Sequence, residues 1–170
     1  AQFTMPFNRE NTDKYYDTDE ELIRDIVKAY GKVLADLYEA GCRNVQLDDC
    51  TWGMLADKTG PMLYGTTAEG AVEVQKRHKD INNQVIANAP EDMIINTHVC
   101  RGNFHSTYAN SGAYDPVAEV LFGEENVNAY FLEFDDERSG GFEPLAKVSG
   151  DKKVVLGLIT TKSPVLEDKA

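Results

Sequence analysis

A histidine and a cysteine two residues apart, His98 and Cys100, have the side chains best suited to chemistry in this sequence. They follow the apolar run 93–95 and precede a polar, glycine-containing segment, a pattern that predicts a buried strand ending in a loop. Because strand side chains alternate between faces, we expect both on one face at the carboxyl end of the strand. Imidazole and thiolate are ligands that zinc prefers, so the pair predicts half of a zinc site. The alternative is a buried cysteine beside a hydrogen-bonded core histidine.

Polar side chains also end three other predicted strands. Asp48 and Asp49 end one strand, Glu133 ends another, and the polar segment 160–163 follows the last. In parallel α/β sheets this end carries the active site, because the loops that follow the strands converge there. Glu133 would supply an anionic third ligand beside His98 and leave zinc with an open fourth position. The alternative is that Glu133 is a solvated acidic residue that starts the acidic run 135–137.

The elements that position these side chains alternate along the chain. Thr18 and Glu21 have the spacing of a capping box, Gly41 is placed to end the helix that they begin, and Thr66 and Glu69 repeat the capping pattern. After an opening loop over 1–17, we expect a helix between 18 and 41, a strand at 44–49, a helix from 66 to about 88, a strand ending at 100, a short helix at 115–122, a strand at 129–134, a short helix at 144–148 and a strand at 154–160. This order predicts an α/β fold with a parallel sheet, in a single domain over 1–170.

Composition limits the class of protein. The chain has 170 residues and is 42% hydrophobic, which is ordinary for a soluble domain with its own core. No apolar run reaches membrane-spanning length and no basic, hydrophobic leader is present, so a cytoplasmic protein without a membrane partner is expected. The formal charge of −12 argues against a nucleic-acid partner. Three cysteines, an odd number, do not form a disulfide framework, which leaves at least one as a free thiol or a ligand.

Several segments, in order and spacing, resemble the catalytic barrel of cobalamin-independent methionine synthase, most closely its short, single-barrel bacterial relatives. These segments are Gln46-Leu47-Asp48-Asp49, His98-Val99-Cys100-Arg101-Gly102-Asn103, Phe131-Leu132-Glu133, Asp135-Asp136-Glu137-Arg138-Ser139-Gly140 and Ser163-Pro164. The resemblance covers nearly the whole chain. It implies a (β/α)8 barrel of the TIM type, of which this chain would form about half, strands four to seven, without the first strands and the last one.

For the full-length protein, the same resemblance implies zinc-dependent transfer of a methyl group from 5-methyltetrahydrofolate, usually polyglutamylated, to the thiol of homocysteine, which gives methionine. This chain alone is expected to be inactive. Carried over by motif, the metal ligands are His98, Cys100 and Glu133. The family's fourth ligand, a cysteine on the last strand, would lie beyond the end of this sequence. Asp48 is implied to bind the amino group of homocysteine, with Asp49 in the place of that family's glutamate.

Other residues are weaker candidates. Lys162 stands where the longer enzymes have a histidine thought to pass the proton, so it is a candidate general acid, provided that its pKa is lowered; the alternative is a solvated loop charge. Cys42 is expected at the wrong end of the sheet for a ligand, and Cys50 lies on a strand where the family has none. Trp52 and Phe104, in loops at the site end, are candidates to flank a pterin ring.

Two further functions stay open. One is a related zinc-dependent thiol methyltransferase or alkyltransferase with a different donor. The other is a non-catalytic structural fragment that self-associates through its open barrel edges, in which case the isolated chain turns over no methyl-folate and binds zinc weakly. His78, in a helix, and His105, in the loop after the motif, are expected to be structural or solvent-facing.

Overall fold

The computed structural model describes residues 6–168. Four strands alternate with helices in it. The strands are β1 (Asn44–Asp48), β2 (Ile94–His98), β3 (Ala129–Glu133) and β4 (Lys153–Gly157). The helices are α1 (Pro6–Thr12), α2 (Asp19–Glu39), α3 (Cys50–Ala56), α4 (Gly60–Leu63), α5 (Ala71–Ala87) and α6 (Ala118–Glu124), with two 3₁₀ helices, η2 (Glu137–Ser139) and η3 (Glu143–Lys147). Within the described range, no helix is both long and apolar enough to cross a membrane.

The four strands form one sheet in the order β1-β2-β3-β4, and every neighbouring pair is parallel. The register sets Asp48 of β1 beside His98 of β2, and His98 beside Phe131 of β3. Glu133 lies two residues beyond Phe131 and pairs with Gly157 of β4. The sequence prediction of an α/β fold built from parallel βα units is therefore confirmed.

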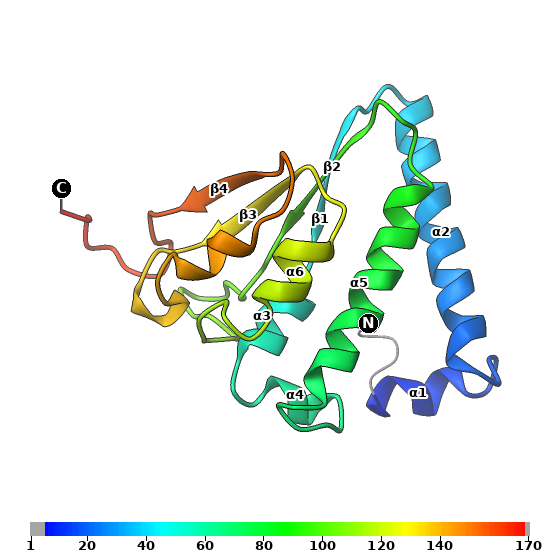
Figure 1. The fold of residues 1–170 in the computed structure, drawn as a ribbon, viewed down its shortest axis with the longest axis horizontal. Helices are drawn as coiled ribbons and strands as arrows, with labels where there is room; N and C mark the ends of the chain where they lie inside the picture. Colours follow the sequence, from blue (N-terminus) through cyan, green and yellow to red (C-terminus); the bar gives the residue numbers. More distant parts are fainter. Residues whose placement is uncertain (1–5, 169–170) are drawn as a thin grey trace.

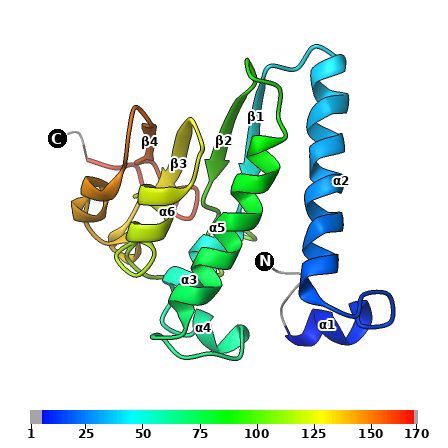
Figure 2. The same ribbon diagram turned by 45° about the vertical axis from the view of Figure 1, so that its right-hand side comes forward.

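Helices cover one face of this sheet. Figures 1 and 2 both show α2 alongside α5, and Figure 2 shows α5 and α6 in front of the strands. Ile95 of β2 and Leu132 of β3 point toward these helices and are 2% exposed. On the opposite face, which carries Asp48 and His98 and is called the inner face below, Ile94 and Val155 are 45% and 43% exposed. The inner face is the more open of the two.

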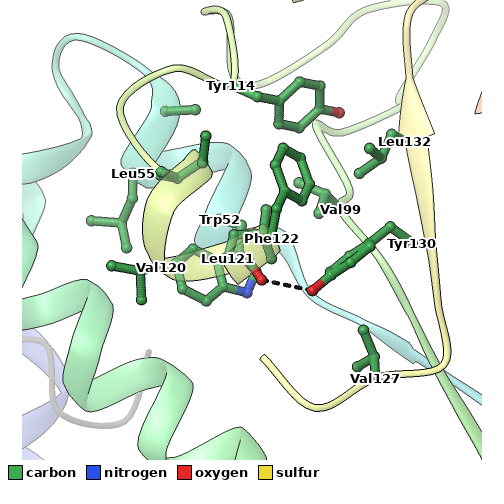
Figure 3. Close-up of a cluster of buried hydrophobic side chains, with 13 residues drawn as sticks. Trp52, Leu55, Val99, Tyr114, Val120, Leu121, Phe122, Val127, Tyr130 and Leu132 are labelled. Carbon is green, nitrogen blue, oxygen red and sulfur yellow. Dashed lines mark hydrogen bonds between the residues drawn. The ribbon is translucent and has the colours of Figure 1, made fainter. Parts of the chain in front are cut away.

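Two apolar clusters fill the space between sheet and helices. The larger one contains Trp52 and Tyr130, both fully buried, and the hydroxyl of Tyr130 donates a hydrogen bond to the carbonyl oxygen of Leu121 at 2.7 Å (Figure 3). The smaller one packs Leu34 of α2 against α5 and Ile95 of β2. Burying a side chain of this size stabilises the fold by roughly 1.5–3 kcal/mol, so these clusters hold the strands in place.

The first long helix, α2, begins as its sequence predicts. The Thr18 hydroxyl accepts a hydrogen bond from the backbone N–H of Glu21 at 3.2 Å. The Glu21 carboxylate accepts in turn from the N–H of Asp17 at 3.1 Å, one residue before the position that a capping box uses. The chain leaves the helix through Gly41, whose φ of +97° favours glycine.

The structure differs from the sequence prediction in its short elements. The opening segment, expected as a loop, contains α1, and the segment after β1 forms α3 and α4. The second long helix begins at Ala71 and not at Thr66, because the Thr67 hydroxyl accepts from the N–H of Gly70 and closes a turn there first. The expected short helix at 144–148 is the 3₁₀ helix η3.

Candidate metal site

Asp48, His98 and Cys100 gather their ligand atoms at the carboxyl end of the sheet. The Oδ1 atom of Asp48 lies 2.9 Å from Nδ1 of His98, as expected of residues that sit side by side in the register. One ligand atom from each of the three residues lies within 4.8 Å of the other two. Among residues 6–168, these three are the histidine, cysteine and acidic side chains that lie close enough together to share one ion. Strand alternation therefore brings His98 and Cys100 together as expected.

The donor set fits zinc. An imidazole, a thiol and a carboxylate are the three ligand types that zinc takes in proteins. Burial raises the pKa of the half-buried Cys100 thiol, and the nearby carboxylates of Asp48 and Glu133 raise it further. A bound cation reverses that balance, because it favours the thiolate. The carboxylate on Nδ1 of His98 is also the arrangement that fixes a histidine so that its other nitrogen faces a metal.

Glu133, predicted as the third ligand, lies near this group but outside it. Its Oε1 accepts from the backbone N–H of Arg101 at 3.2 Å. Its Oε2 accepts from the guanidinium of Arg138 at 2.9 Å and from the ammonium of Lys162 at 3.4 Å. Burial raises the pKa of the carboxyl, but the hydrogen bond from Arg138 and the N–H of Arg101 outweigh it and lower the pKa overall. The carboxylate is ionised and anchored one strand away from His98, and its role as a ligand stays a prediction.

Lys162 lies within the same site. Its side chain is 11% exposed, and its Nζ is 3.4 Å from Glu133 and 3.7 Å from Asp135. The alternative of a solvated loop charge is therefore not what the structure contains. The ammonium is ion-paired beside the predicted ligand, and its role as general acid stays a prediction.

The two neighbouring aspartates have different surroundings. Asp48 is on the inner face, whereas the side chain of Asp49 points toward α5 and is 11% exposed. There Asp49 accepts from Nε2 of His78 at 2.7 Å and from Nδ2 of Asn82 at 2.9 Å. Burial raises the pKa of Asp49, but the charge and hydrogen bond of His78 outweigh it, and the pKa falls to about 2. Of the two predicted substrate-binding residues, Asp48 is the one that faces the candidate site.

Helix α3 packs closely against the chain just after β2. A Cβ atom added at Gly53 would lie 2.5 Å from the carbonyl oxygen of Cys100. The glycine is therefore what lets the helix approach the backbone at Cys100.

Comparisons with known proteins found similar sequences and a similar solved structure. Two relatives from Bacillus subtilis (strain 168), the uncharacterized proteins YxjH and YxjG, are each 41% identical to this chain, over 96% and 90% of its length. A solved structure from Listeria monocytogenes, named "Putative Vitamin-B12 Independent Methionine Synthase", is 31% identical over 91% of this chain, with a TM-score of 0.63. No protein-family model matches the chain.

The likeness covers only part of each relative. The chain spans 44% and 41% of the two Bacillus proteins and 42% of the Listeria protein. With its four parallel strands in one sheet, the chain has the fold of a partial TIM-type barrel.

Sequence analysis missed several residues around the site. His78, expected to be structural or solvent-facing, is 4% exposed and holds Asp49. Asn82, whose amide bonds Asp49, carries no local signal, because its partners come from distant parts of the chain. Arg138 belongs to a segment that carries the family resemblance, but its bond to Glu133 was not predicted. Trp52, a candidate to flank a pterin ring, is fully buried in α3, so that role is wrong for it; Phe104 is 76% exposed.

Proposed function

We propose that this chain forms part of the catalytic barrel of a cobalamin-independent methionine synthase, which transfers a methyl group from 5-methyltetrahydrofolate polyglutamate to homocysteine with the help of zinc. The observation that carries the proposal is the convergence of His98, Cys100 and Asp48 at the strand ends. The 31% identity to the Listeria protein of that name supports it.

The roles of the side chains follow from their positions. His98 and Cys100 would hold zinc, with Glu133 as the third ligand, and the ion would supply a homocysteine sulfur that is deprotonated and able to attack a methyl group. Asp48, exposed on the inner face, would accept a charge-assisted hydrogen bond from the cationic amino group of homocysteine. Lys162 would carry the proton that the tertiary amine of the donor needs before it can leave.

Zinc binding tests the site directly. The metal-free chain is titrated with zinc against a chromophoric chelator, for the wild type, His98→Asn and Cys100→Ser. We expect one zinc per wild-type chain and a loss of affinity of about 100-fold or more in either variant, because removal of a ligand costs more than the 10- to 100-fold of an outer-shell partner. Cys42→Ser is the matched control, because its Sγ donates to the carbonyl of Asn44 at the opposite end of β1. Equal affinities in all four proteins would refute the site.

A second pair of variants distinguishes the carboxylate that binds zinc from the carboxylate that binds the substrate. Glu133→Gln is expected to weaken zinc binding, because an amide is a poor zinc ligand. Asp48→Asn is expected to lower zinc affinity less, by no more than the 10- to 100-fold of an outer-shell partner, and to weaken the binding of homocysteine by the zinc-loaded chain. The reverse pattern would make Asp48 the ligand and Glu133 a partner of Arg138 and Lys162 only.

Turnover separates the enzyme from the non-catalytic alternative. The chain is incubated with zinc, homocysteine and methyl-labelled 5-methyltetrahydrofolate carrying one or three glutamates, and labelled methionine is measured. Tight zinc binding with turnover would exclude the alternative of a structural fragment. Zinc binding without turnover on any folate would support either that fragment or a related thiol methyltransferase with a different donor, which a panel of labelled methyl donors distinguishes.

A further inference from the structure

A buried chain of polar groups joins the candidate metal site to the helices behind the sheet. It begins at Asp49, the residue after Asp48, whose Oδ2 accepts from His78 and Asn82 of α5. It continues from Nδ2 of Asn82 to Oε1 of Glu125 at 2.6 Å. The His78 and Asp49 side chains are 5% and 11% exposed, and Glu125 is fully buried. His78 and Glu125 are therefore shielded from solvent, and the hydrogen bonds of this chain run between its own members.

Asp49 makes more hydrogen bonds than the capping of α3 requires. Its Oδ1 accepts from the N–H of Thr51 at 3.0 Å and so caps the start of α3. Its own N–H donates to the carbonyl oxygen of His98 at 2.8 Å, which extends the sheet by one bond. A helix cap needs only one carboxylate oxygen. The second oxygen is held by His78 and Asn82, which ties the backbone just after Asp48 to α5.

Asp48 in turn holds His98. Since consecutive strand residues point to opposite faces, the orientation of Asp48 depends on the backbone that Asp49 anchors. A rotation of that backbone would move Oδ1 of Asp48 from its position 2.9 Å from Nδ1 of His98. Hydrogen bonds of this kind set the orientation of a metal-binding histidine, and removing them typically lowers metal affinity 10- to 100-fold.

We propose that His78 and Asn82 are positioning residues for the candidate metal site. By holding Asp49 from α5, they fix the backbone that places the Asp48 carboxylate against His98. The inference rests on the proposed function only in requiring that the site binds a metal. Neither residue contacts the ion or a substrate. Both act through two consecutive aspartates, one on each face of β1.

The test compares His78→Leu with His78→Gln. Glutamine keeps an N–H donor at the position of Nε2, whereas leucine removes the donor and keeps the volume. We expect His78→Leu to bind zinc 10- to 100-fold more weakly and to change the visible spectrum of the Co²⁺-loaded chain, and His78→Gln to restore both. Gln84→Ala is the matched control, because its amide is exposed and donates to the carbonyl of Asp80 within α5, away from Asp49.

A purely structural role predicts a different result. Thermal unfolding would then show a lower midpoint for His78→Leu, while the zinc affinity of the folded protein stayed equal to that of the wild type, and this result would overturn the inference. If His78→Leu does not fold, Asn82→Ala takes its place, since His78 and Thr51 still hold Asp49 in that variant.

Two further readouts separate this inference from the proposed function. In the metal-free chain, the ring nitrogen signals of His98 in ¹⁵N NMR should shift in His78→Leu and return in His78→Gln; unchanged signals would overturn the positioning role. A wild-type chain that binds no zinc would overturn the proposed function as well. Zinc binding that is lost in Cys100→Ser but unchanged in His78→Leu would overturn the positioning role alone.

Discussion

Two buried carboxylates, Asp49 and Glu125, share the amide of Asn82 but have opposite pKa shifts. Burial raises the pKa of both. In Asp49 the charge and hydrogen bond of His78 reverse this effect, and the pKa falls to about 2. In Glu125 the negative charge of Asp49 adds to burial, and the pKa rises to about 8. The buried network therefore holds one carboxylate ionised and one protonated at neutral pH.

The Glu125 shift makes stability depend on pH. The carboxyl titrates near 4.5 when unfolded and near 8 when folded, so the folded chain holds an extra proton between these values. The contribution of this extra proton to the free energy of unfolding is complete below about pH 4.5. It is lost as the pH rises to about 8, by up to roughly 1.4 kcal/mol per pH unit. Glu125→Gln removes this titration. We expect urea unfolding between pH 6 and 9 to give a flatter curve for the variant; two parallel curves would contradict the prediction.

At the scale of elements, the N-terminus of α2 gives a clean stability test. Thr18→Ala removes the hydroxyl that accepts from Glu21, and such a cap typically contributes about 1 kcal/mol. We expect urea unfolding to show a loss of that size. Thr66→Ala is the control, because the same sequence pattern predicts a cap there while the structure begins α5 five residues later. A larger loss at Thr66 than at Thr18 would contradict the assignment.

The long elements were predictable because their periodicity extends over several turns. The stripe of apolar residues in α2 and the alternation in β2 each repeat often enough to identify the element and its buried face. The short helices α1, α3 and α4 have four to seven residues, too few for a period to be recognised. Their position depends on packing, as in α3, where Trp52 is buried against the ring of His78.

The candidate site was predictable in part for the same reason. His98 is the last residue of β2 and Cys100 follows two residues later, so the alternation of the strand, continued through Val99, is enough to predict that they meet. The contact between Asp48 and His98 needs the register of two strands, and the anchoring of Glu133 needs the loop that carries Arg138 and the distant Lys162. Contacts between separate elements are not encoded in local patterns, which is why Asn82 was missed.

At the scale of the whole molecule, the parallel sheet that residues 6–168 form ends at β1 and β4, with no further described strand beside either, and has an open inner face. Parallel sheets are normally covered on both faces, and free edges pair readily with other strands. We therefore predict that the isolated chain self-associates. Higher salt should strengthen the association, because it screens the repulsion between chains of charge −12.

Sedimentation velocity tests this prediction. Leu158 and Ile159, just after β4, are 52% and 77% exposed. Leu158→Lys with Ile159→Lys should shift the chain toward the monomer, because charged residues at an edge oppose pairing. Met62→Lys, an equally apolar and exposed position on α4, is the control and should leave the distribution unchanged. A wild-type monomer at all concentrations and salt levels would contradict the prediction.

The close approach of α3 to Cys100 leaves no room for a side chain at Gly53. Any other residue there must push the helix away from the strand that bears the thiol, and with it the aspartate cap at the start of that helix. In a saturation library of this chain sorted for bound metal, position 53 should therefore be among the least tolerant, although it supplies no ligand and no charge. Glycine, which has no side chain, would then tolerate substitution at this site as poorly as the histidine does.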